Sequence, residues 1–386
     1  MEDTMRLTNS DIAELTEFRR HLHRHPELSG REAWTAAEVV AALQPLAPDQ
    51  ILTGLGGHGV AAVWEATEPG PTVLFRSELD ALPIEELSEA PYRSSVPGTA
   101  HLCGHEGHST ILLGLARLIA RDGPKRGRVV LMFQPAEEDG SGAAAVLADP
   151  RFAGIRPDWA FALHNMPGMP LGHAVIAPGA ANCASEGLRV VFRGRTAHAS
   201  APDTGVSPAL ALAALMPAAM AAGPGGALGP GFRLVSLCHA RMGAPAFGVT
   251  PGEGELWLTL RTLADADMAA LRDDVMGQAR HLAEQHGLAV EFSHHDRFAA
   301  CTNDPEAAAA IAKALDALGL RHDSRGLPMR ASEDFGLFGS VSRSAMFLLG
   351  SGETLPALHN PDYDFPDALI PQGVAIFDRL RRDLLG

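Results

Sequence analysis

The fold is decided by one stretch, Val129-Val130-Leu131-Met132-Phe133-Gln134-Pro135-Ala136-Glu137-Glu138-Asp139-Gly140. Its first residues are all apolar, a pattern typical of a β-strand that is buried on both faces of a sheet. The strand ends at Gln134-Pro135, and three acidic residues follow shortly afterwards. Because open parallel sheets carry their functional loops at the carboxyl ends of the strands, this stretch predicts a parallel sheet with chemistry at that edge.

Strand and helix patterns alternate on either side of this stretch. Apolar strand patterns occupy residues 59–64, 72–78, 159–163 and 344–349. Patterns with helical spacing occupy residues 32–43, 110–120, 306–318 and 368–384. This alternation predicts a mainly parallel sheet with helices on both faces.

The rhythm changes near Cys183. From there the expected order is strand, helix, strand, strand, helix, strand, which is the order of the ferredoxin-like motif. We therefore expect two domains: an α/β domain made of residues 1–183 and 294–386, and an inserted α+β ferredoxin-like domain over residues 184–293.

The composition of the 386-residue chain bounds its partners and location. A formal net charge of -15 argues against nucleic acid, whose binding requires a basic surface. The chain contains no apolar run near the ~20 residues of a membrane span, and residues 1–11 lack the apolar core of a secretory signal. Since the four cysteines are far apart and form no CxxC pair, we expect a reducing compartment, the cytoplasm.

The densest group of reactive side chains is His101-Leu102-Cys103-Gly104-His105-Glu106-Gly107-His108, between an expected strand and an expected helix. Thiolate and imidazole both bind borderline cations such as Zn²⁺, and a cysteine and a histidine two residues apart can face one centre. A buried thiol among surface histidines is the plain alternative. Such dense clustering favours the metal site.

Further candidates lie at strand ends or in loops of the same domain. Glu137 and Glu138 follow the strand over 129–133, where one carboxylate could bind a cation and its neighbour polarise a water. Acids at a helix N-terminus would be an equally ordinary arrangement. His164 ends the strand over 159–163, and His359 lies in a loop before the last helix. Each alone could be an ordinary polar residue, but together they favour one metal centre.

Taken in order, these motifs resemble those of the M20 metallopeptidase family, and within it the amidohydrolase branch that includes hippurate hydrolases and auxin-conjugate hydrolases. The resemblance covers nearly the whole chain. The matching segments are His23-Arg24-His25-Pro26-Glu27-Leu28-Ser29, Asp80-Ala81-Leu82-Pro83-Ile84, Cys103-Gly104-His105, Glu137-Glu138, Leu163-His164, Ser332-Glu333-Asp334-Phe335 and His359-Asn360-Pro361.

The resemblance implies a metal-dependent enzyme that hydrolyses the amide bond of an N-acyl amino acid or a related small amide. It implies two divalent metal ions (Zn²⁺, Mn²⁺, Co²⁺ or Ni²⁺) with the ligands Cys103, His105, Glu138, His164 and His359. Cys103 would bridge the two ions where other branches use an aspartate, and Glu137 would be the general base. Arg76 stands where other branches place a histidine ligand.

The resemblance also implies a role for the inserted domain. This domain would serve as a lid and as the dimerisation domain of a homodimer or a higher homo-oligomer. His198 would reach the active site of a neighbouring subunit and donate a hydrogen bond to the oxyanion.

Two positions depart from the family pattern. Glu106 stands where the family usually has an aspartate, so the contacts of this side chain must shift. Gly248 stands where the family usually has an asparagine that helps an arginine, here Arg261, to hold the substrate. His239 or Arg241 could supply the missing donor. We therefore expect substrate contacts around His198, Arg261, Gly248 and His239, and a preference for an unusual amide.

Three other functions stay open at this point. Cys103 could be a nucleophile with His105 or His101 as its base, which would leave Glu137, Glu138, His164 and His359 without a role. The chain could be a non-catalytic binding protein that keeps the fold. It could also perform related chemistry, such as the deamination of an aryl amine, with the same activated water.

Overall fold

The computed structural model describes residues 6–386; residues 1–5, part of the segment expected to lack a secretory signal, lie outside the described residues. The chain divides into two units. The first consists of residues 6–181, Cys301–Leu327 and Asp334–Gly386, and the second of Asn182–Ala300 and Pro328–Glu333. The second unit extends beyond the expected range 184–293 because its last strand continues to Phe298 and because Pro328–Glu333 joins it.

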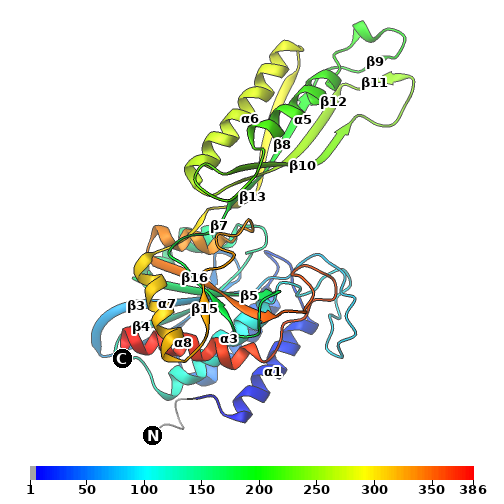
Figure 1. Ribbon diagram of the computed structural model, residues 1–386. Helices are drawn as coiled ribbons and strands as arrows, with labels where there is room; N and C mark the ends of the chain where they lie inside the picture. Colours follow the sequence, from blue (N-terminus) through cyan, green and yellow to red (C-terminus); the bar gives the residue numbers. More distant parts are fainter. Residues whose placement is uncertain (1–5) are drawn as a thin grey trace. The chain divides into compact units, whose positions relative to one another are not determined.

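Among the described residues, eight strands of the first unit form one sheet in the order β1-β2-β4-β3-β5-β16-β6-β15 (Figure 1). The central strands β4, β3, β5 and β16 are parallel, whereas β1 and β2 form an antiparallel edge. This sheet confirms the expected mainly parallel α/β fold. The bounds are β1 Gln50–Leu55, β2 Gly59–Glu65, β3 Glu68–Glu78, β4 Arg126–Gln134, β5 Trp159–Pro167, β6 Ala174–Val175, β15 His322–Asp323 and β16 Arg343–Gly352.

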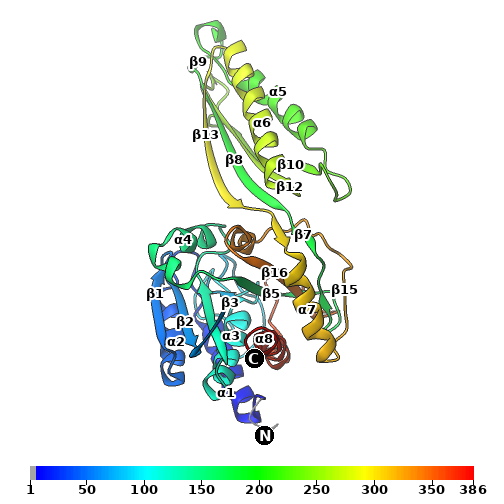
Figure 2. The same cartoon turned by 90° about the vertical axis from the view of Figure 1, so that its left-hand side faces the viewer.

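Helices cover both faces of this sheet, as Figure 2 shows. Val129, Leu131 and Phe133 of β4 belong to one apolar core, and Val130 and Met132 belong to the core on the opposite face. Because successive side chains of a strand point to opposite faces, a strand covered on both sides has no polar position, which explains the uninterrupted apolar run.

The two cores are built with different helices. The first core is formed with α1 Asn9–Arg24, α2 Ala33–Leu43, α3 His105–Arg121, α7 Pro305–Ala317 and α8 Leu369–Leu385. The second core is formed with α4 Gly142–Ala148 and the 3-10 helices η3 Pro150–Ile155 and η5 Asp334–Ser340. The short pieces η2 Gln44–Leu46, β7 Gly179–Asn182 and β14 Cys301–Asn303 complete the connections.

The second unit has the ferredoxin-like order that the sequence predicts. Its antiparallel sheet runs β10-β12-β8-β13, and α5 and α6 share one apolar core with it. The bounds are β8 Ala184–Arg193, α5 Ala209–Ala222, β10 Arg233–Met242, β12 Glu253–Thr262, α6 Asp265–Gln285 and β13 Ala289–Phe298. A two-stranded ribbon of β9 Ala197–His198 and β11 Val249–Thr250, and the 3-10 turn η4 Pro202–Thr204, were not expected.

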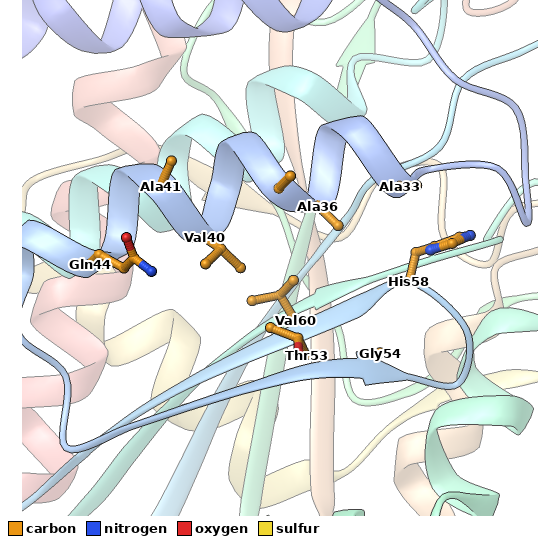
Figure 3. A pocket seen from close by; sticks show the side chains of 10 residues that line it. Ala33, Ala36, Val40, Ala41, Gln44, Thr53, Gly54, His58 and Val60 are labelled. Atoms are coloured by element: carbon orange, nitrogen blue, oxygen red, sulfur yellow. The ribbon is translucent and has the colours of Figure 1, made fainter.

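Two general features bear on where function can lie. Within residues 6–386, none of the helices combines the length and the apolar character needed to cross a bilayer. A groove of about 430 Å³ lies between α2 and the β1–β2 hairpin (Figure 3). Its walls are mostly small apolar side chains, with Gln44 and His58 among them, and they include no candidate metal ligand.

Candidate metal centre

The five ligands expected from the sequence come together at the carboxyl edge of the first sheet. The ligand atoms of Cys103, His105 and His164 lie within 4.8 Å of one another, and so do those of Cys103, Glu138 and His359. Cys103 belongs to both groups. The structure therefore places two sets of donors side by side with one thiol in common, which is the arrangement that a pair of cations with a shared thiolate requires.

The environment of His105 fits a cation. Its Nδ1–H donates to the backbone oxygen of Asp80 at 3.0 Å, which leaves the lone pair on Nε2. The buried Nε2 has no hydrogen-bond partner and lies 3.7 Å from Glu138 and 3.8 Å from Glu137. Burial opposes a positive charge here, but Asp80, Glu78 and Glu138 outweigh it and raise the pKa of His105 to about 10. This position therefore attracts either a proton or a metal ion.

The two other histidines also present a ring nitrogen toward the centre. His164 uses Nδ1 for the backbone oxygen of Asn165 at 2.7 Å, and its Nε2 lies 3.5 Å from the Cys103 sulfur. Burial and the neighbouring His108 and His105 lower the pKa of His164 to about 3, so it is neutral at pH 7, as a ligand must be.

The position of His359 is fixed by its backbone conformation and by a backbone hydrogen bond. Its φ is +67°, an unusual value for a residue other than glycine, and such conformations gather at functional sites. Its N–H donates to the backbone oxygen of Leu102 at 2.8 Å, which ties the loop to the metal-binding turn. Nε2 of His359 lies 3.7 Å from a carboxylate oxygen of Glu138.

The surroundings of Cys103 argue against a nucleophilic thiol. Burial, together with the carboxylates of Glu138 and Glu137, raises the pKa of Cys103 well above its usual value. A nucleophilic cysteine needs the opposite shift, which positive neighbours provide. A cation between the thiol and these carboxylates would stabilise the thiolate, so the site favours coordination over nucleophilic attack.

The loop that carries Glu137 and Glu138 is fixed by hydrogen bonds from its backbone to two buried carboxylates. Ala136 has a φ of +51°, and its N–H donates at 2.8 Å to the buried carboxylate of Glu32. The N–H of Glu138 donates at 2.9 Å to Asp80, whose carboxylate also accepts the Ser29 hydroxyl at 2.7 Å. Asp80 thus orients both a histidine and a glutamate of the donor set.

Gly104 and Gly107 are required because a larger side chain would clash with its neighbours. Gly104 has a φ of +91°, and a Cβ there would come within 2.7 Å of the Asn165 amide. That amide donates to the Cys103 backbone oxygen at 2.6 Å and thereby fixes the turn. A Cβ at Gly107 would lie 2.5 Å from the ring of Phe365, so the start of α3 can approach that ring only without a side chain.

A buried arginine, Arg76, lies near the candidate donors. Arg76, on β3, pairs with Glu78 and Asp334 and donates to Gln134 at 3.0 Å. Glu78 in turn pairs with Nδ1 of His108 at 2.6 Å. The guanidinium and its partners are all fully buried, so each charge is compensated locally. Asp334, part of a motif quoted for the resemblance, is thus a partner of Arg76.

The candidate substrate residues lie in the second unit, and they do not form one cluster within it. The ribbon pairs His198 with Val249, next to Gly248, whose backbone oxygen accepts the Ala199 N–H at 3.0 Å. His239 pairs with Trp257 and lies 3.9 Å from Glu255. Arg261 lies near the end of β12, where it donates to the Arg330 backbone oxygen and to the Ser332 hydroxyl, both at 2.8 Å.

Sequence reasoning assigned no role to several residues that support the donors. Asp80 carried one available signal, because it follows a buried strand just as Glu137 does. Asn165 carried the same signal, since it directly follows His164 at the end of a buried apolar run, whereas Glu32 carried none, because its partner Ala136 is far away in the sequence.

The fold and the site together define a class of protein. An α/β sheet whose carboxyl edge holds donors for two cations, beside a further carboxylate, is the arrangement of a metal-dependent hydrolase. Residues 74–383 match the family described as peptidase family M20/M25/M40, and the chain belongs to this family. It is therefore a hydrolase of amide bonds.

Individual relatives agree with this assignment. The hippurate hydrolase of Campylobacter jejuni is 28% identical over 371 residues, which are 95% of each chain. The N-acetylcysteine deacetylase of Bacillus subtilis is 27% identical over 369 residues, again 95% of each chain. The crystal structure of the YXEP protein of Bacillus subtilis, described as a dinuclear metal-binding peptidase of family M20, has a TM-score of 0.82 and 26% identity, and the match covers 98% of this chain and 99% of that one.

Proposed function

We propose that this protein removes the acyl group from an N-acyl amino acid or a related small amide, with two divalent cations held by Cys103, His105, Glu138, His164 and His359. The observation that carries the proposal is the pair of donor groups that share Cys103. Named functions of relatives point the same way, since they include a hippurate hydrolase and an N-acetylcysteine deacetylase. Zn²⁺, Mn²⁺, Co²⁺ and Ni²⁺ all suit this mixture of sulfur, nitrogen and oxygen donors.

Bound cations would supply an acidified water and a polarised amide carbonyl. Glu137 would then accept the proton of the attacking water and return it to the leaving amine. Its carboxylate is suited to this task, because it is only 5% exposed and lies beside the donor set, 3.8 Å from Nε2 of His105. The products would be a carboxylic acid and an amine.

His198 would donate a hydrogen bond to the oxyanion. The tautomer of its ring supports this role, since Nδ1 accepts the backbone N–H of Ser200 at 3.2 Å. The proton of the neutral ring therefore resides on Nε2, which is free to act as a donor. We further propose that the second unit acts as the lid and joins subunits in a homodimer or a higher homo-oligomer, and that the enzyme works in the cytoplasm, where Cys103 stays reduced.

Metal removal and replacement test the proposal. The protein is stripped with EDTA and reloaded with defined amounts of each metal, and products from a panel of N-acyl amino acids are quantified. We expect activity to disappear on stripping and to return with two equivalents of metal. Cys103→Ala should lose metal, by elemental analysis, together with activity. Activity that survives EDTA would support a thiol enzyme instead, and release of ammonia from an aryl amine would support a deaminase.

A further inference from the structure

A second buried charge cluster lies beside the metal centre, at the inner side of α1. Its centre is the guanidinium of Arg19, which is completely buried. Arg19 donates to Asp364 at 2.6 Å, to Asp367 at 2.9 Å and to Glu106 at 3.4 Å. Arg19 already supplies a positive charge among these carboxylates, which argues against a further metal ion among His23, Glu106 and Asp364, although their ligand atoms lie close enough for one.

The three carboxylates belong to the two segments that carry the candidate donors. Glu106 directly follows His105 at the start of α3, and Asp364 and Asp367 lie in the loop between β16 and α8 that also contains His359. Arg19 therefore connects the Cys103–His105 turn with the His359 loop by charge-assisted hydrogen bonds, which are the stronger kind.

The same two segments also touch at other points. His359 donates its N–H to Leu102, and the ring of Phe365 packs against Gly107. Glu106 receives a further contact from Nδ1 of His23 at 2.8 Å, and Tyr92 donates to Asp364 at 2.6 Å. Arg19 closes this arrangement from the side of α1, with the ring of Tyr92 4.7 Å below its guanidinium.

Glu106 stands where the family usually has the shorter aspartate, and its side chain makes two of these contacts. One carboxylate oxygen, Oε1, reaches both His23 and Arg19. Residues outside the immediate donor set orient the ligands of a metal site, and their loss typically weakens metal binding ~10–100-fold.

We propose that Arg19 is a positioning residue for the metal centre: it holds the Cys103–His105 turn and the His359 loop at the spacing that the two donor groups need. The inference rests on the proposed function only in that metal ions bind at this site. The hydrogen bonds of Arg19 go to Glu106, Asp364 and Asp367, none of which is a candidate donor.

Metal affinity tests the inference. The variants are Arg19→Met and Asp364→Asn, which break the same contact from opposite sides, and Arg19→Lys, which keeps the charge but not the planar geometry. Arg20→Met is the matched control, because Arg20 lies next to Arg19 and donates to the same Asp367 at 2.7 Å, so it shares the position and the charge but not the contact of Arg19 with Glu106. Affinity for Co²⁺ and Mn²⁺ is measured by calorimetry on metal-free protein, and the thiolate-to-Co²⁺ absorption reports on Cys103.

We expect Arg19→Met and Asp364→Asn to bind metal ~10–100-fold more weakly and to change the Co²⁺ absorption, with Arg19→Lys between them and the wild type. Arg20→Met should bind like the wild type. Asp364 is part-exposed, so Asp364→Asn tests the contact even if Arg19→Met does not fold. Wild-type affinity in a folded Asp364→Asn variant, or equal losses in the Arg19 and Arg20 variants, would overturn the inference. If the wild type itself bound no metal, the proposed function would fail instead.

Discussion

The metal-binding edge of the first unit and the ribbon face of the second unit hold their functional candidates in opposite ways. At the metal-binding edge, donors from separate strand ends converge, and buried partners such as Asp80, Asn165 and Glu32 fix them. On the second unit, His198 is exposed; its backbone pairs with Val249 in the ribbon, and its ring is hydrogen-bonded to Ser200 of the same turn. The first region is built to keep one geometry, whereas the second presents side chains that can meet a substrate.

The difference teaches where each kind of function is encoded. A pair of cations needs donors at fixed separations, so the fold gathers the candidate donors: Cys103 and His105 are buried, His164 and Glu138 are partly buried, and His359 is exposed. The proposed substrate contacts need accessible groups, and His198 and Gly248 are indeed exposed, on or beside the short ribbon strands. Changes at the metal-binding edge should therefore affect metal content or chemistry, and changes on the ribbon should affect turnover and preference with the metal retained.

The sharpest test within the metal-binding edge separates Glu137 from its neighbour Glu138. Glu137→Gln keeps the size of the side chain and removes its basicity. We expect kcat to fall ~10²–10⁴-fold while two equivalents of metal remain bound. Elemental analysis and steady-state kinetics check this, with Glu138→Gln as the matched variant that should lose metal as well. Wild-type turnover in Glu137→Gln would remove the assignment of the base.

The second test moves to the ribbon. His198→Ala removes the proposed donor from an exposed position, so neither folding nor metal content should change. We expect kcat to fall ~10²–10³-fold, the usual effect of losing an oxyanion donor. The exposed His295, also in the second unit, offers a control, because His295→Ala should leave kcat unchanged. A change in KM alone would assign His198 to substrate binding and not to the transition state.

The same contrast explains how far sequence reasoning could reach. The gathering of the five candidate donors could be predicted, because Cys103 and His105 stand in a dense motif and because Glu138 and His164 follow apolar strands. The supporting contacts were not predictable, because Glu32 and Ala136, or Arg76 and Asp334, meet only through tertiary structure. The ribbon strands, two residues each, are too short to show any periodicity.

The third test uses pH to distinguish a proton from a metal ion at His105. In the metal-free protein the pKa of His105 is raised from 6.5 to about 10, although burial opposes this, because Asp80 and nearby carboxylates favour the charged ring. The corresponding stability is complete below pH 6.5 and is lost as the pH rises toward 10. Metal binding must displace this proton, so metal affinity should rise by up to ~tenfold per pH unit across the same window.

Thermal unfolding with and without metal, together with metal titrations between pH 6.5 and 10, measures both effects. His23 provides an internal reference: burial opposes its charge, but Glu106 and Glu86 raise its pKa to about 9. The contribution of His23 is the same in the metal-free and the metal-loaded protein. The difference between their curves of stability against pH therefore reports on the metal site. Parallel curves would show that the proton at His105 does not compete with metal.

The smallest effect is expected at Gly248, which stands beside the ribbon where the M20 family usually has an asparagine. Gly248 is exposed, no atom lies within 4 Å of the position a Cβ would take, and its φ is not in the left-handed region, so Gly248→Asn should fold without strain. If the added amide donates to a substrate carboxylate, a bond to a charged group contributes ~1.5 kcal/mol or more, which is roughly tenfold. We expect the variant to gain about that factor in kcat/KM for hippurate relative to a carboxylate-free benzamide. Gly229→Asn, at another unobstructed glycine of the same unit, is the control and should leave the ratio unchanged. An unchanged ratio in Gly248→Asn would mean that the ribbon does not read the carboxylate, and the contrast between the two regions would then rest on His198 alone.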